Sequence, residues 1–220
     1  MPDLTPASAT AHPALLFDLD GTLVDSVADL GSAVNRLRAE HSLPPLPPAT
    51  IRTCVGDGAT VLVQRTLPAE AFSVAALQRF LALYADVLLD QTRPYPGIVD
   101  FLAARRHWPL AVVTNKPEGM TRVLLAGLGL DIYFPVIIGG DTLTEKKPHP
   151  APVLAALKHL GCRPQDAVMI GDHHTDLRAG AAAGTRTCFC VWGIGQDDGL
   201  PTDHRATTVN DLQQLFPVQP

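Results

Sequence analysis

The sequence predicts an α/β fold, with a Rossmann-like parallel sheet as its core and a helical domain inserted after the first strand. Short apolar runs alternate with helical patterns along most of the chain, which is typical of βαβ units. Polar residues gather where four of these runs end, and open α/β sheets place their ligand crevice at the carboxyl ends of strands. One stretch without a clear strand pattern, residues 25–93, interrupts the alternation.

The first expected strand starts at Ala14 and leads into Asp18, further acidic residues and Gly21. This pattern predicts a buried strand followed by a loop. Four more apolar runs follow, at residues 109–113, 134–138, 167–170 and 186–191. The second and fourth of the five runs end in Thr114-Asn115 and in Gly171-Asp172.

Helical patterns separate these runs, as right-handed crossovers between parallel strands require. They cover residues 97–107, 117–128, 151–160 and 175–183. Pro117 is expected in the first turn of its helix, where its missing N–H has no cost. Gly161 closes the third pattern, and Gly184 is the expected C′ residue of the fourth.

Residues 25–93 are expected to form a separate helical cap domain. Three helical patterns fill it, at residues 27–41, 59–67 and 73–89, and a proline-rich piece separates the first two. We therefore predict a core domain of residues 12–24 and 94–220 with the cap of residues 25–93 between its parts. Residues 1–11 are predicted to be a disordered N-terminal lead-in.

The composition restricts the class of partner. The net charge is −5 and no long block of Lys or Arg occurs, so no nucleic-acid partner is expected. No apolar stretch reaches the roughly 18 residues of a membrane span, so no membrane partner is expected either. The first 13 residues do not resemble a secretory signal, and the four cysteines lack a C-x-x-C pair. We expect a cytoplasmic monomer or homodimer with reduced thiols.

The candidate active site begins with Asp18 and Asp20 at the end of the first strand. Two residues at i and i+2 leave a strand on the same side, and Gly21 allows the backbone to turn there. Buried carboxylates this close repel each other and need a cation or a shared proton. Mg²⁺ fits, because it binds oxygen ligands from one or two carboxylates and a substrate phosphate. One aspartate can then act as nucleophile while the other transfers a proton.

Later strand ends supply the remaining candidates. Thr114 and Asn115 offer a hydroxyl and an amide to phosphate oxygens. Lys147 can stabilise the developing phosphoryl charge. Asp172 can complete the metal site, and Asp176 can hold a metal-bound water or orient the lysine. Each signal is weak alone, but their order along the chain, each after an expected strand, indicates phosphoryl chemistry.

These motifs resemble those of the haloacid dehalogenase superfamily of phosphohydrolases, over residues 18 to about 191. Its four motifs look like D-L-D-G-T from Asp18, Thr114-Asn115, Lys147-Pro148, and Gly171-Asp172 with Asp176. The place of the helical insert is similar to that of the C1 cap group. The resemblance implies Asp18 as nucleophile and Asp20 as general acid and then base. It also implies Mg²⁺ held by Asp18, the Asp20 carbonyl and Asp172.

Within the superfamily the chain looks most like the phosphoglycolate phosphatases, which implies hydrolysis of 2-phosphoglycolate. This resemblance rests on D-L-D-G-T-L-V-D-S from residue 18, the cap loop of residues 55–59, Y-P-G from residue 95 and K-P-H-P from residue 147. Gly56 and Asp57 of the cap loop are candidate substrate-binding residues. Asp57 replaces the usual asparagine, and its carboxylate would disfavour an acidic substrate unless it points away or pairs with Arg52 or Arg65.

The fourth motif also departs from the usual pattern, because His173-His174 replace Ser-Arg or similar residues. Both histidines are expected to be exposed turn residues in front of a helix. The departures keep two alternatives open. One is a phosphatase acting on another small metabolite, such as a sugar phosphate, and the other is a phosphomutase of the same fold. Asp20 and Asp172 argue against a dehalogenase. A phosphate-binding protein without activity is not expected to keep the complete set of acidic and basic residues.

Overall fold

Within residues 12–218, which the computed structural model describes, the chain folds around a six-stranded parallel sheet of order β5-β4-β1-β6-β7-β8. The strands are β1 (Ala14–Phe17), β4 (Leu110–Val113), β5 (Val136–Ile138), β6 (Ala167–Gly171), β7 (Arg186–Cys190) and β8 (His204–Ala206). The predicted α/β fold with a parallel sheet is confirmed. The predicted lead-in, residues 1–11, lies outside the described residues.

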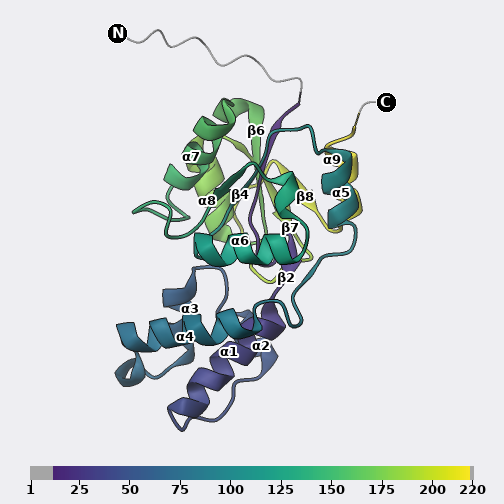
Figure 1. The fold of residues 1–220 in the computed structure, drawn as a ribbon. Coiled ribbons are helices and arrows are strands. Elements are labelled where there is room, and N and C mark those ends of the chain that lie inside the picture. Colours follow the sequence, from purple (N-terminus) through teal and green to yellow (C-terminus); the bar gives the residue numbers. More distant parts are fainter. Residues whose placement is uncertain (1–11, 219–220) are drawn as a thin grey trace.

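Helices cover both faces of the sheet, as Figure 1 shows. These are α5 (Ile98–Ala104), α6 (Glu118–Gly127), α7 (Ala151–Leu160), α8 (His174–Ala183) and α9 (Val209–Leu215). On the central strand β1, Leu15 and Phe17 belong to the apolar cluster that includes α5, α6 and α9. Leu16 belongs to the cluster that includes α7 and α8. Because β1 is buried on both faces, its sequence is a continuous apolar run and not an alternating one.

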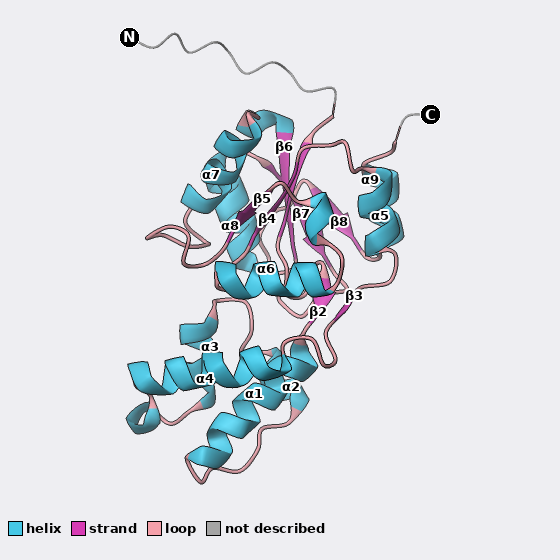
Figure 2. Cartoon of the chain, in the orientation of Figure 1, coloured by secondary structure: helices cyan, strands magenta, loops and turns pink. Residues whose placement is uncertain are grey.

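The segment after β1 forms a group of helices beyond one end of the sheet, visible at the bottom of Figure 2. They are α1 (Val27–Glu40), α2 (Pro48–Arg52), α3 (Ala59–Thr66) and α4 (Val74–Val87). The Asp29 carboxylate joins the two ends of this segment, because it accepts hydrogen bonds from Gln91 N, Thr92 N and Thr92 Oγ1 at 2.7–3.0 Å. Asp29 is fully buried, so loss of these bonds would leave an unpaired charge in the interior.

The expectation that residues 25–93 contain no strand is wrong at the two ends of the segment. Short strands β2 (Val24–Asp25) and β3 (Arg93–Pro94) pair antiparallel where the chain leaves the core and returns to it. A pair of two-residue strands is too short to produce an alternating pattern. Three further α-helices or strands were also not predicted: α2, the edge strand β8 and the final helix α9. Each is short, and α2 begins inside the proline-rich piece.

The register of the sheet sets the position of the site. Leu15 of β1 lies opposite Leu110 of β4 and Val168 of β6, in parallel. The carboxyl ends of these three strands therefore meet at one edge, which faces the helical insert (Figure 1). None of the helices among residues 12–218 has the length and apolarity needed to cross a membrane.

Candidate active site

Buried acidic side chains converge at the carboxyl edge of the sheet. Asp18 directly follows β1, Asp172 directly follows β6, and Asp176 lies in the first turn of α8. Each offers a carboxylate oxygen, and these atoms lie within 4.8 Å of one another. The sequence predicted these three residues as neighbours, and the fold brings them together.

Lys147 is the cation of this cluster. Its Nζ atom lies 2.9 Å from Asp18 Oδ1 and 2.6 Å from Asp176 Oδ1, and it also donates to the Val113 carbonyl at 2.6 Å. Burial disfavours the charged ammonium, but attraction to Asp176 and Asp18 outweighs this and raises the pKa of Lys147. The lysine is therefore held in its charged form between two carboxylates.

Close backbone approach and three hydrogen-bonding groups hold Asp172. Its Oδ2 accepts hydrogen bonds from Ile194 N and Gly195 N at 2.8 Å each, and its Oδ1 accepts one from Thr22 Oγ1 at 3.0 Å. Gly21 has φ +89°, and a β-carbon on it would lie 2.2 Å from Asp172 Oδ2. The D-L-D-G-T loop thus needs glycine at this position both for its backbone conformation and for space.

The donor set fits a hard divalent cation. Burial, followed by repulsion from Asp18 and Asp176, raises the pKa of Asp172 to about 7. Burial also raises the pKa of Asp18 to about 6, although Lys147 acts in the opposite direction. A cation between these oxygens would replace their repulsion by attraction, and clustered carboxylates are the ligands that Mg²⁺ and related ions prefer. This cluster could therefore bind a metal ion.

These raised pKa values predict how stability depends on pH when divalent cations are chelated. Asp18 and Asp172 bind protons more tightly in the folded state than in the unfolded chain, so stability falls as pH rises through their folded pKa values. We expect the melting temperature in chelator to decrease between about pH 5 and pH 7.5, where ordinary carboxylates are ionised in both states. Calorimetry over this range measures the slope. Asp172→Asn should flatten it, and a rising melting temperature would contradict the interpretation.

Asp20 has partners that the sequence did not predict. Lys116 Nζ lies 3.1 Å from both of its carboxylate oxygens, and Ser26 Oγ donates to Oδ1 at 2.6 Å. The same ammonium donates to the Tyr84 hydroxyl at 2.6 Å, which ties α4 of the insert to the core. Lys116 is buried and directly follows Thr114-Asn115, and this sequence position is the one signal that could have identified it.

Thr114 and Asn115 lie in the site, but their polar atoms are already used in part. Thr114 Oγ1 accepts a hydrogen bond from Lys116 N at 3.3 Å. Asn115 Nδ2 donates to the carbonyls of Gly56 and Lys147 at 3.1 and 3.0 Å, so it connects the cap loop to the core. Asn115 Oδ1 is buried and has no hydrogen-bond partner among the described residues.

A small cavity of about 40 Å³ lies over Asp18 and Asp20, between the core and the insert. Gly56 and Gly58 of the cap loop line it, together with Lys116. Apolar side chains also line it: Leu30, Val55, Leu62, Phe80 and Leu81 of the insert, and Met120 of α6. The cavity therefore combines carboxylates at the sheet edge with apolar side chains that come mostly from the insert.

Asp57 takes one of the two arrangements that the sequence allowed. Its Oδ2 pairs with Arg65 NH1 at 2.7 Å. Asp57 and Arg65 line a second cavity of about 250 Å³ between the cap loop and the start of α8, which we call the outer cavity. Arg52 lines it too and donates to the Gly193 carbonyl at 2.6 Å, whereas Arg93 donates to the carbonyls of Leu89, Thr92 and Asp90.

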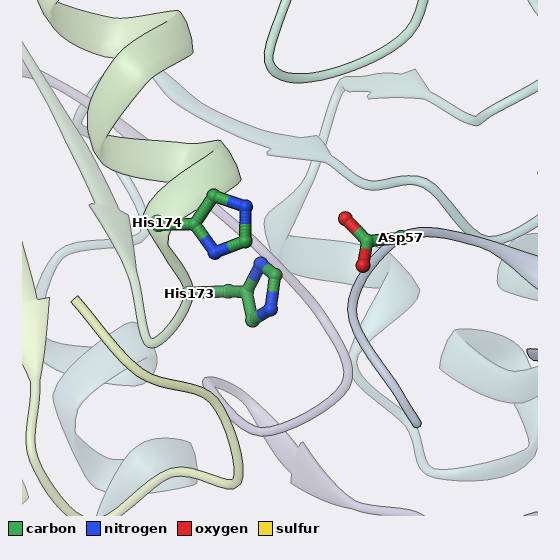
Figure 3. Close-up of side chains that lie close together, drawn as sticks. All are labelled: Asp57, His173 and His174. Carbon is green, nitrogen blue, oxygen red and sulfur yellow. The ribbon is translucent and has the colours of Figure 1, made fainter. Parts of the chain in front are cut away.

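The expectation that His173 is an exposed turn residue is wrong. It is 8% exposed and is the N-cap of α8, where Thr175 N donates to its Nδ1 and Asp176 Oδ2 accepts from its backbone N. The cap loop also covers it, since a β-carbon at Gly56 would lie 2.8 Å from its ring. Burial, followed by the neighbouring His174, lowers the pKa of His173 to about 4. Figure 3 shows both rings side by side, facing Asp57.

Comparison with known proteins shows the family to which the chain belongs. A family described as "Haloacid dehalogenase-like hydrolase" matches residues 15–190. A protein of Chromobacterium violaceum named phosphoglycolate phosphatase is 40% identical over 212 residues, which cover 92% of this chain and 94% of the relative. A protein of Nitrosococcus oceani with the same name is 42% identical over 210 residues, covering 91% of this chain and 93% of the relative.

A solved structure also matches nearly the whole chain. The crystal structure of a predicted phosphoglycolate phosphatase from Haemophilus somnus 129PT superposes with a TM-score of 0.85 at 30% identity. The match covers 94% of this chain and 99% of the other. The similarity therefore includes the sheet and the helical insert alike.

Proposed function

Since this chain belongs to the haloacid dehalogenase-like hydrolase family and is a phosphatase, we propose that it hydrolyses 2-phosphoglycolate to glycolate and phosphate. The observation that carries the proposal is the buried group of Asp18, Asp172 and Asp176, with Lys147 bridging Asp18 and Asp176. Asp18 of this group lines the cavity of about 40 Å³, together with Asp20 and Gly56 of the cap loop. The relatives that match nearly the whole chain carry the name of this activity.

Asp18 is the proposed nucleophile. Its carboxylate oxygen attacks phosphorus, the P–O bond to the substrate alcohol breaks, and an aspartyl phosphate forms. Asp20 gives a proton to the leaving oxygen and later takes one from the water that hydrolyses the aspartyl phosphate. Lys116 and Ser26 hold the Asp20 carboxylate in place for both transfers. Phosphate and the free Asp18 carboxylate are the products of the second step.

Lys147 and the loop residues stabilise the transferred group. The Lys147 ammonium faces the nucleophilic carboxylate at 2.9 Å and can stabilise charge on the phosphoryl oxygens. Thr114 is proposed to donate to the same oxygens, and Asn115 to fix the cap loop above them. Mg²⁺, when bound by Asp18, Asp172 and the Asp20 carbonyl, would supply Lewis-acid stabilisation of the phosphoryl charge. Asp176 orients Lys147 at 2.6 Å.

The helical insert is proposed to act as a cap domain over the core, with the boundaries given by residues 25–93. The β2–β3 pair and the hydrogen bonds that Asp29 accepts from residues 91 and 92 support this division. Both join the two segments that connect the insert to the core. Gly56 of the cap loop lines the substrate cavity, whereas Asp57 is turned to the outer cavity and Arg65. The added carboxylate is therefore compatible with an acidic substrate.

The protein is also proposed to act in the cytoplasm, on a small soluble metabolite, as a monomer or homodimer. All four cysteines are buried, and burial raises the pKa of the Cys188 thiol to about 12. Buried neutral thiols fit a reducing compartment, where cysteine serves as a small apolar residue.

Phosphate release from a panel of esters tests the proposed substrate. We expect 2-phosphoglycolate to give the highest kcat/KM with Mg²⁺, above glucose 6-phosphate and glucose 1-phosphate. Removal of Mg²⁺ by chelator should lower the rate at least about 100-fold, since metal stabilisation of phosphoryl charge contributes several kcal/mol. A sugar phosphate as the best substrate would reject phosphoglycolate and keep the phosphatase. A rate independent of Mg²⁺ would reject the metal site.

A further inference from the structure

A group of nitrogen and oxygen ligands lies outside the proposed catalytic site, between the cap loop and the core. Asp57, His173 and His174 each offer one ligand atom, and these atoms lie within 4.8 Å of one another. Figure 3 shows the two imidazole rings facing the Asp57 carboxylate across the gap. All three line the outer cavity of about 250 Å³, so an ion and its water ligands have room there. We propose that this group binds a divalent transition-metal ion, Zn²⁺ in particular, which fastens the cap loop to the core.

The ring nitrogens on the far side of the proposed site already have oxygen partners. Nδ1 of His174 lies 3.3 Å from Asp198 Oδ2, and Nδ1 of His173 lies 3.0 Å from Thr175 Oγ1. With a proton on Nδ1 of His174, its contact becomes a donated hydrogen bond and its Nε2 keeps its lone pair. For His173, binding of an ion at Nε2 requires Nδ1 to donate to Thr175 Oγ1 and to give up the 3.4 Å hydrogen bond that it accepts from Thr175 N. Metal-binding histidines usually have such an oxygen acceptor behind the ring, which fixes the tautomer and the ring orientation.

One oxygen of the Asp57 carboxylate is available as a metal ligand. Arg65 occupies its Oδ2 atom, which leaves Oδ1 as the ligand oxygen. Tetrahedral Zn²⁺ places its ligand atoms about 3.4 Å apart, given bonds of about 2.0–2.2 Å. The three ligand atoms now lie within 4.8 Å of one another. Side-chain rotations that move each ligand atom by about 1 Å bring them to the spacing of a tetrahedral ion. Water can complete a fourth position in the cavity.

The ligand chemistry separates this site from the acidic cluster. Two imidazoles and one carboxylate suit Zn²⁺ and related transition metals, whereas a set of carboxylates alone suits Mg²⁺. The positive side chains of the outer cavity have oxygen partners of their own, since Arg52 donates to the Gly193 carbonyl and Arg65 pairs with Asp57. Asp198 also lines the cavity, and its Oδ2 lies 3.3 Å from His174 Nδ1 and 3.7 Å from Arg178 NH2.

The position of the ligands implies a consequence for turnover, which rests on the proposed function. Asp57 belongs to the cap loop, and the two histidines are the N-cap and the first residue of α8 in the core. An ion bound to both parts would hold the loop against the core and slow opening of the substrate cavity. Zn²⁺ is therefore expected to inhibit phosphate release in the presence of saturating Mg²⁺.

Titration calorimetry with Zn²⁺, in an excess of Mg²⁺ that occupies the acidic cluster, tests the site without any activity assay. We expect one Zn²⁺ per chain in the wild type and an affinity at least about 10-fold lower in His174→Asn. His159→Asn, which changes an exposed histidine on α7, should bind Zn²⁺ as the wild type does. Co²⁺ in place of Zn²⁺ should give the visible absorption of a four-coordinate ion in the wild type and in Asp18→Asn.

Three outcomes would overturn the proposal: no Zn²⁺ binding in excess Mg²⁺, equal affinity in His174→Asn, or loss of the Co²⁺ absorption in Asp18→Asn. The last result would place the ion in the acidic cluster. Inhibition is measured separately, and we expect His174→Asn to need at least about 10-fold more Zn²⁺ for half inhibition. If no ester is hydrolysed at all, the proposed function fails while the calorimetric result still decides the metal site.

Discussion

Asp18→Asn is expected to reduce phosphate release by about 10⁴-fold or more, because it removes the proposed nucleophile and no neighbouring group can form the same covalent bond. The amide has nearly the shape of the carboxylate, so the loss reports chemistry and not packing. The measurement is kcat/KM for 2-phosphoglycolate in saturating Mg²⁺. Acid quenching during turnover, followed by mass spectrometry, should detect a phosphate adduct on the Asp18 peptide of the wild type only.

The same substitution should not unfold the protein. Burial raises the pKa of Asp18 to about 6, so its ionised form opposes folding at neutral pH when no divalent cation is present. We therefore expect Asp18→Asn to melt in chelator at the wild-type temperature or above it. Asp100→Asn, on the exposed side of α5, is the matched control and should keep wild-type activity. Substantial turnover by Asp18→Asn would show that another group is the nucleophile.

The sequence predicted the parts of the site that depend on local rules. Asp18, Thr114 and Asp172 each follow an apolar run directly, and parallel strands bring such positions to one edge. No long-range information is needed for this step. The sheet in turn needs only continuous apolar runs of the right length between helices. Site residues could therefore be predicted from the sequence where they directly follow a strand.

The pairings between distant residues were not predictable in the same way. Lys116 reaches Asp20 from 96 positions away, and Arg52 reaches Gly193 from 141 positions away. A lysine after a strand could equally be solvated. Whether it is buried and paired depends on where the fold places α4 and the rest of the insert. His173 illustrates the same limit, because its burial results from the cap loop that folds over it and not from its own neighbours.

Lys147→Met is expected to lower both stability and activity. The substitution keeps a long flexible side chain but leaves Asp18 and Asp176 in the interior without their cation. Removal of one partner from a buried ion pair costs about 3–5 kcal/mol. At roughly 2–4 °C per kcal/mol for a protein of this size, the melting temperature in chelator should fall by about 10 °C. Lys158→Met, an exposed lysine on α7, should leave it unchanged.

A double substitution separates the structural role of Lys147 from its catalytic role. In Lys147→Met/Asp176→Asn the carboxylate that lies 2.6 Å from the ammonium is also neutralised, so at least about half of the lost stability should return. Activity should not return, because the charge that faces the phosphoryl group is still missing, and loss of such a group costs about 10²–10³-fold in kcat. If the double variant regains activity together with stability, Lys147 only neutralises the interior. If stability does not recover, the pair with Asp176 is not the source of the loss, and the repulsion between Asp18 and Asp172 becomes the dominant cause.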